Sequence, residues 1–86
     1  MKLNDLRKEI NEIDEKMLDL FEKRMAVASQ IGQYKRKHQL PVLDKVREDA
    51  LLNTMIGKIS DPSLKTYYEK FLKHLMDLSK AYQHEN

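Results

Sequence analysis

The chain has 86 residues, enough for a single domain with a thin hydrophobic core, and 35% of them are charged. Its 16 basic and 14 acidic residues leave a net charge of +2, too balanced to indicate nucleic-acid binding. The absence of cysteine excludes disulfides and thiolate sites, and no apolar run approaches a signal peptide or the roughly 20 residues of a membrane span. We therefore expect one soluble, cytoplasmic domain over residues 1–86, stabilised by a partner subunit.

The first predicted element is a long amphipathic helix over about residues 3–38. Its apolar residues recur at steps of three and four: Leu3, Leu6, Ile10, Ile13, Met17, Leu20, Val27 and Ile31. Arg24 falls in this series, where the register calls for a core residue. At about 1.5 Å per residue the helix would run roughly 50 Å, too long for the rest of the chain to cover. A second copy of the chain is the expected partner.

Charge is segregated along this helix. Acidic residues gather in its first part, and none occurs between residues 23 and 43, where Arg24, Lys35, Arg36 and Lys37 lie. Two copies laid antiparallel would place each acidic half beside a basic half. The pattern therefore favours an antiparallel homodimer.

Two shorter helices are predicted after a loop. Pro41 ends the first helix, because proline cannot continue the hydrogen-bond ladder. Asp44 suits the N-cap of a second helix over about 44–59, and Asp61 followed by Pro62 opens a third over about 62–84. Three helices and two short loops account for the chain, without strand-like alternation. The predicted fold class is therefore all-α.

Several cations of the first helix have no acidic residue at helical spacing, among them Arg7, Arg24 and Lys35. Arg24 and Lys35 lie three turns apart on nearly one face, with Ala28 and Gly32 between them, an arrangement that suits a compact dianion. The alternatives are an Arg24 side chain extended to water and a Lys35 favoured by the helix dipole. Gly32 indicates either a ligand against the backbone or close helix packing.

Arg7 precedes Arg24 by 17 residues, which is roughly 25 Å along a helix axis. Within one chain it cannot join a site at Arg24. From an antiparallel partner that crosses near Met17 it can.

Polar residues of the shorter helices are further candidates. Asp44, Arg47 and Glu48 begin the second helix, where capping and the helix dipole are the simpler interpretation. Ser79 and Gln83 share one face of the third helix, with a fraying polar end as the alternative. The three histidines lack ligand spacing, and no phosphate-binding glycine loop or nucleophile motif occurs, so we expect neither a metal nor a cofactor.

Several of these residues form one ordered series along the chain: Leu6-Arg7-x-x-Ile10-x-x-x-Asp14, Arg24, Gly32, Lys35, Pro41-Val42-x-Asp44-x-x-Arg47-Glu48 and Ser79-x-x-x-Gln83. This series resembles the all-helical, AroQ-type chorismate mutases of the compact bacterial kind. The resemblance implies an intertwined helical-bundle homodimer of three-helix chains with active sites shared between subunits. It also implies an isomerase of the shikimate pathway that rearranges chorismate to prephenate, for phenylalanine and tyrosine biosynthesis, without a cofactor.

The resemblance also implies a role for each polar residue. Lys35 and Gln83 would be catalytic, donating hydrogen bonds to the ether oxygen of chorismate. Substrate binding would fall to these residues: Arg7 of the partner subunit, Arg24, Asp44, Arg47, Glu48 and Ser79. A free-standing mutase is expected, with control by a separate pathway enzyme left open. An isochorismate pyruvate-lyase on the same scaffold and a non-catalytic helical dimerisation module are the alternatives.

Overall fold

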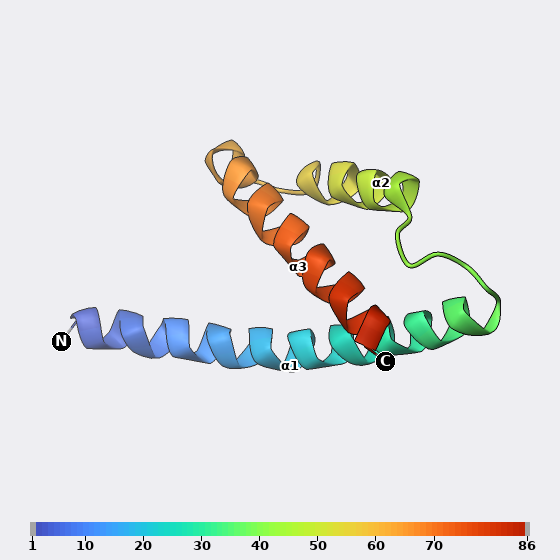
Figure 1. Cartoon of the computed structure of the whole chain (residues 1–86). Coiled ribbons are helices and arrows are strands. Elements are labelled where there is room, and N and C mark those ends of the chain that lie inside the picture. The colour runs from blue at the N-terminus through green and yellow to red at the C-terminus, as the bar shows by residue number, and fades with distance from the viewer. Residues whose placement is uncertain (1, 86) are drawn as a thin grey trace.

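The computed structural model describes residues 2–85 of the chain (Figure 1). Within them the chain forms helix α1 (Lys2–Lys37), helix α2 (Lys45–Ile56), a short 3-10 helix η1 (Pro62–Leu64) and helix α3 (Lys65–Glu85), with no β-strand. The predicted all-α class with three helices is confirmed. Met1 and Asn86, the two ends of the expected 1–86 domain, lie outside the described residues.

Helix α1 ends at Lys37 because the backbone turns left-handed just after it. Gln39 has a φ of 57°, and the amide of Leu40 donates to the carbonyl of Lys35 at 2.7 Å. This is a C-terminal capping arrangement that satisfies carbonyls of the last turn. Pro41 follows two residues later and prevents the helix from resuming.

Helix α2 is capped as predicted but is shorter than predicted. The Asp44 side chain accepts a hydrogen bond of 3.0 Å from the backbone amide of Arg47, the standard N-cap interaction. At the other end α2 stops at Ile56 instead of continuing to 59. The next amides, of Lys58 and Ile59, reach back only three residues, so the last turn tightens and the helix ends.

Helix α3 is preceded by the predicted cap and proline. The Asp61 carboxylate accepts from the backbone amide of Ser63 at 3.0 Å and from its hydroxyl at 2.7 Å. Pro62 then opens η1, which passes directly into α3 at Lys65. The third helical segment thus starts at Pro62, in 3-10 form for its first turn.

Helix α3 packs against both α1 and α2. Figure 1 shows the C-terminal end of α3 crossing the C-terminal half of α1, with α2 and the C-terminal end of α1 on the same side of α3. The N-terminal half of α1 runs on beyond this crossing, and every residue from 2 to 23 is exposed. The molecule is therefore elongated, with extents of 56 × 26 × 15 Å.

The core of the single chain is correspondingly small. Its buried apolar side chains are Ala28, Leu72 and Met76, at the crossing of α1 and α3. The radius of gyration is 16.0 Å, against about 12 Å for a compact domain of this length. The accessible surface is 7140 Å², against about 5300 Å² for a folded monomer of this mass. The excess of about 1800 Å² per chain is on the scale of a subunit interface.

The apolar series predicted along α1 remains largely uncovered within one chain. Leu6, Ile10 and Ile13 are each more than half exposed, and Leu20 is 64% exposed. Residues 2–85 contain no helix with the length and apolarity needed to cross a membrane. The exposed series is a stripe on a charged helix, which is the pattern of a surface that packs against another helix.

Candidate active site

A cavity of about 290 Å³ lies where α1, the start of α2 and the C-terminal half of α3 meet. It is lined by Arg24, Ile31, Lys35, Val42, Asp44, Arg47, Glu48, Leu51, Met76, Ser79, Lys80 and Gln83. Seven of the eight residues predicted for the site are among them, and they come from all three helices. The eighth, Arg7, lies on the exposed half of α1 and does not line the cavity.

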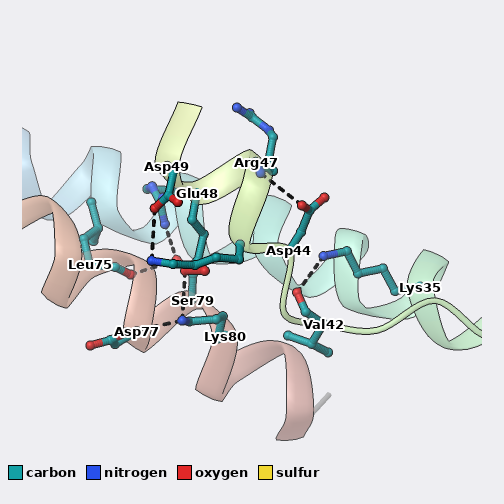
Figure 2. Close-up of polar contacts among 12 residues, drawn as sticks. Lys35, Val42, Asp44, Arg47, Glu48, Asp49, Leu75, Asp77, Ser79 and Lys80 are labelled. Atoms are coloured by element: carbon teal, nitrogen blue, oxygen red, sulfur yellow. Dashed lines mark hydrogen bonds and ion pairs between the residues drawn. The ribbon is translucent and has the colours of Figure 1, made fainter. Parts of the chain in front are cut away.

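Arg24 is held between α1 and α3 by the hydroxyl of Ser79. Its Nη1 donates to the Ser79 Oγ, while that hydroxyl donates its own hydrogen to the carbonyl of Leu75 at 3.0 Å. Because the serine proton is directed to Leu75, a lone pair of Oγ faces the guanidinium. Figure 2 shows Ser79 at this position on α3. Arg24 is thus turned toward the cavity and half-buried, not extended to water.

The Lys35 side chain on α1 is hydrogen-bonded to the loop that joins α1 to α2. Its Nζ donates to the carbonyl of Val42 at 2.8 Å, and Figure 2 shows this side chain reaching over the loop. The contact ties the loop to the last turns of α1 and holds the ammonium group at the cavity wall. One of the three ammonium donors is used in this contact, which leaves capacity for a ligand.

Gln83 is fixed where α3 crosses the C-terminal part of α1. It is only 7% exposed, and its backbone carbonyl accepts a hydrogen bond of 2.6 Å from Arg36. A Cβ atom on Gly32 would lie 3.0 Å from the Cα and carbonyl oxygen of Gln83. Gly32 therefore serves close packing of α1 on α3, the second of its two interpretations.

Ser79 and Gln83 are therefore not a fraying polar end. Both are buried, in line with Leu72 and Met76 on the inner face of α3. The side-chain Oε1 of Gln83 is buried without a hydrogen-bond partner. An unpaired buried amide oxygen is costly in a folded protein, and only a group that donates a hydrogen bond can satisfy it.

The start of α2 places Glu48 opposite α3. Its Oε1 lies 2.8 Å from the Nζ of Lys80, with the Glu48 side chain 19% exposed and that of Lys80 29% exposed (Figure 2). Asp77 approaches the same ammonium at 3.4 Å from a position 69% exposed. The hydrogen bond with Glu48 raises the pKa of Lys80 above its ordinary value of 10.5, although desolvation by burial acts to lower it.

Lys80 is a cavity residue that sequence reasoning missed. Asp77 lies three residues before it on α3, so its local pattern is that of an ordinary surface ion pair. The contact with Glu48 joins residues of different helices and has no signal in the local sequence.

The cavity carries more positive than negative charge. Four basic side chains and two acidic ones line it, an excess of two positive charges: Arg24, Lys35, Arg47 and Lys80 against Asp44 and Glu48. Such an excess in a concave site attracts a small dianion.

An apolar groove of about 740 Å³ adjoins the cavity between α1 and α3. Its lining includes Leu20, Phe21, Phe71 and Leu78, and Arg24 lines both the groove and the cavity. Whatever covers the groove therefore comes to lie beside Arg24.

The fold and the cavity define a small all-α protein with a cavity whose lining carries more basic than acidic side chains. The sequence model of the family described as "Chorismate mutase type II" matches residues 6–84. The chain therefore belongs to the chorismate mutase type II family, which confirms the resemblance carried by its polar residues.

A relative is the T-protein of Haemophilus influenzae, which is 44% identical over 50 residues. The matched segment covers 58% of this chain and 13% of the T-protein. The chain therefore corresponds to a small part of that longer protein.

Proposed function

We propose that this chain catalyses the rearrangement of chorismate to prephenate, a step of phenylalanine and tyrosine biosynthesis. The observation that carries the proposal is the cavity in which seven family-pattern residues from three helices meet; with Lys80, its lining has an excess of two positive charges. Chorismate is a compact dianion, and its rearrangement is unimolecular. The site therefore has to bind, orient and stabilise charge, without transferring a proton or forming a covalent bond to the protein.

Binding of the two carboxylates falls to the guanidinium groups. Arg24, oriented by Ser79, faces one carboxylate, because a guanidinium makes planar bidentate contacts and stays charged at all working pH values. Arg47 at the start of α2 and Arg7 of the partner subunit complete the charge needed for the dianion. Holding both carboxylates restricts the flexible substrate to its reactive diaxial conformer, which removes conformational entropy from the barrier.

The ether oxygen gains negative charge as its bond to carbon breaks. Lys35 on α1 and Gln83 on α3 line the cavity from opposite helices and would donate to this oxygen. Preorganised donors of this kind typically lower the activation barrier by about 3 kcal/mol each. Glu48 and the backbone beside Asp44 would hold the ring hydroxyl and so set the orientation of the ring.

We further propose that the active form is an antiparallel, intertwined homodimer. The exposed apolar series of α1, the apolar groove and the excess accessible surface all call for a covering helix. Segregated charge along α1 favours an antiparallel copy. A partner helix in the groove would lie beside Arg24 and bring its own Arg7 to the cavity.

The proposed activity is tested by incubating the protein with chorismate and following its disappearance spectrophotometrically. Formation of prephenate is the expected result. Incubation with isochorismate and detection of salicylate tests the lyase alternative on the same scaffold. No turnover of either substrate by folded dimer would leave the non-catalytic dimerisation module as the function.

The shared site is tested by mixing two inactive variants, Arg7→Ala and Arg24→Ala, under subunit exchange. Each heterodimer contains one site with both arginines intact, so random pairing should restore about one quarter of wild-type activity. Arg24→Ala chains mixed with the Arg7→Ala/Arg24→Ala double variant form the control, because no intact site can arise. Exchange without recovery of activity would refute the two-chain site.

A further inference from the structure

The ion pair between Lys80 and Glu48 is a polar contact of the cavity that the proposed roles do not use. It joins α3 to α2 across 2.8 Å, between side chains that are both less than one-third exposed. Two ion pairs of these helices that do not involve Lys80 differ in this respect. Lys73 with Glu69 and Lys45 with Asp49 are 3.0 Å pairs within one helix, with every side chain more than 40% exposed.

Lys80 has less capacity than Lys35 to act as a direct substrate ligand. Its ammonium group is shared by Glu48 at 2.8 Å and Asp77 at 3.4 Å, which occupy two of its three donors. Both carboxylates favour the charged form of Lys80, since the hydrogen bonds and charges of Glu48 and Asp77 raise its pKa. The lysine therefore acts on the cavity chiefly through the carboxylate that it holds.

An unpaired Glu48 would conflict with a dianionic ligand. Its carboxylate lines the same cavity as Arg24 and Lys35, in a partly desolvated position where charge repulsion is weakly screened. With Lys80 the lining carries an excess of two positive charges, and without Lys80 the excess falls to one. Loss of the Lys80 ammonium would also allow the Glu48 side chain to rotate away from the cavity wall.

We propose that Lys80 is a positioning residue, which fixes the Glu48 carboxylate at the cavity wall and offsets its charge so that the site accepts a dianion. This assignment rests on the proposed function, because the dianion is chorismate and Glu48 holds its ring hydroxyl. Lys80 thus allows the Glu48 carboxylate to accept a hydrogen bond from the substrate hydroxyl in a site that also binds the two negative charges of the substrate.

The test compares Lys80→Met with two controls in steady-state kinetics on chorismate. Methionine keeps most of the length and loses the charge, so KM should rise and kcat/KM should fall about tenfold. Lys80→Arg restores the charge and should return kcat/KM to within about twofold of wild type. Lys73→Met removes a lysine from the same helix outside the cavity and should leave kcat/KM unchanged.

A double-mutant cycle separates positioning from direct contact. If Lys80 acts through Glu48, then Lys80→Met should change kcat/KM by less than about twofold in a Glu48→Gln background. The same tenfold loss in that background would overturn the assignment, because the lysine would then act on the substrate without Glu48. Thermal unfolding of each variant verifies that the rates belong to folded protein. Lys80→Gln serves as the second neutral variant if Lys80→Met does not fold.

Failure of this inference is distinct from failure of the proposed function. Wild-type protein that does not convert chorismate overturns the function and the assignment together. Active wild-type protein with an unchanged kcat/KM in Lys80→Met overturns the assignment alone.

Discussion

Replacing Gly32 by alanine tests whether the close crossing of α1 and α3 sets the position of Gln83. The added Cβ would lie 3.0 Å from the Cα and carbonyl oxygen of Gln83 and 3.1 Å from its Cβ. Ordinary contacts of this kind begin at 3.4 Å, so the two helices must separate by about 0.4 Å. Two of the three atoms belong to the backbone, and a side-chain rotation therefore cannot relieve the contact.

Two opposing terms decide the effect of Gly32→Ala on stability. Alanine favours the interior of a helix over glycine by about 1 kcal/mol. Forcing an extra methyl group into a tight contact costs about 1–3 kcal/mol. The free energy of unfolding should therefore fall by about 0–2 kcal/mol, a change that leaves the protein folded.

The effect on turnover should be larger than the effect on stability. In the proposed complex, displacing α3 would move the Gln83 amide away from the ether oxygen of chorismate and strain the hydrogen bond from Arg36 to the Gln83 carbonyl. Misplacement of a catalytic group by about 1 Å costs about a hundredfold in rate. A shift of about 0.4 Å should therefore lower kcat roughly tenfold, with a smaller change in KM.

Gly57→Ala is the matched control for this experiment. A Cβ at Gly57 would meet the carbonyl oxygens of Asn53 and Thr54 at 3.4 and 3.5 Å, within ordinary contact, and its φ of −63° suits alanine. Both kcat and the free energy of unfolding should stay at wild-type values or rise slightly. A Gly32→Ala enzyme with wild-type kcat would refute the view that this crossing positions Gln83.

Three further outcomes are expected. Lys35→Ala and Gln83→Ala should each lower kcat about 10²–10³-fold with less change in KM, measured in steady state, and the wild-type rate should be nearly flat across neutral pH because Gln83 does not titrate. Asp61→Ala should lower the Tm at neutral pH. Hydrogen bonds from Ser63 hold the pKa of Asp61 below 3.8, so this stabilisation is present above that pH and is lost as pH falls through the lower folded value. Circular-dichroism melts should therefore converge for wild type and variant in acid, and a constant difference would contradict the cap. Dilution should lower specific activity and helicity together, and activity that persists in a purified monomer would contradict the shared site.

The helix starts were predictable because they depend on local chemistry. Asp44, and Asp61 followed by Pro62, are capping patterns whose partners lie two or three residues away, and both make the expected hydrogen bonds. The end of α2 was less predictable. Ile59 continues the apolar pattern, while the tightened turn after Gly57 that ends the helix has no comparable signal.

The candidate site was predictable to the extent that its residues break local patterns. Arg24 stands in an apolar register, and Gly32 is a glycine within a helix, so the sequence alone distinguishes both from their neighbours. The structure adds what spacing cannot supply, namely that Ser79 orients Arg24 and that Gln83 lies against Gly32. Lys80 follows an ordinary local pattern through Asp77, and only the packing of α2 on α3 reveals its contact with Glu48.

The length of α1 gives this helix two separate tasks. Its C-terminal half carries Arg24, Gly32 and Lys35 at the crossing with α3, and its N-terminal half is exposed along its whole length. Arg24 lines both the cavity and the apolar groove, so one residue stands at the boundary between the site and the surface that needs cover. Burying the groove and completing the cation set would therefore be the same event. In the proposed dimer, a helix of this length would both line its own site and supply Arg7 to the site of the partner subunit.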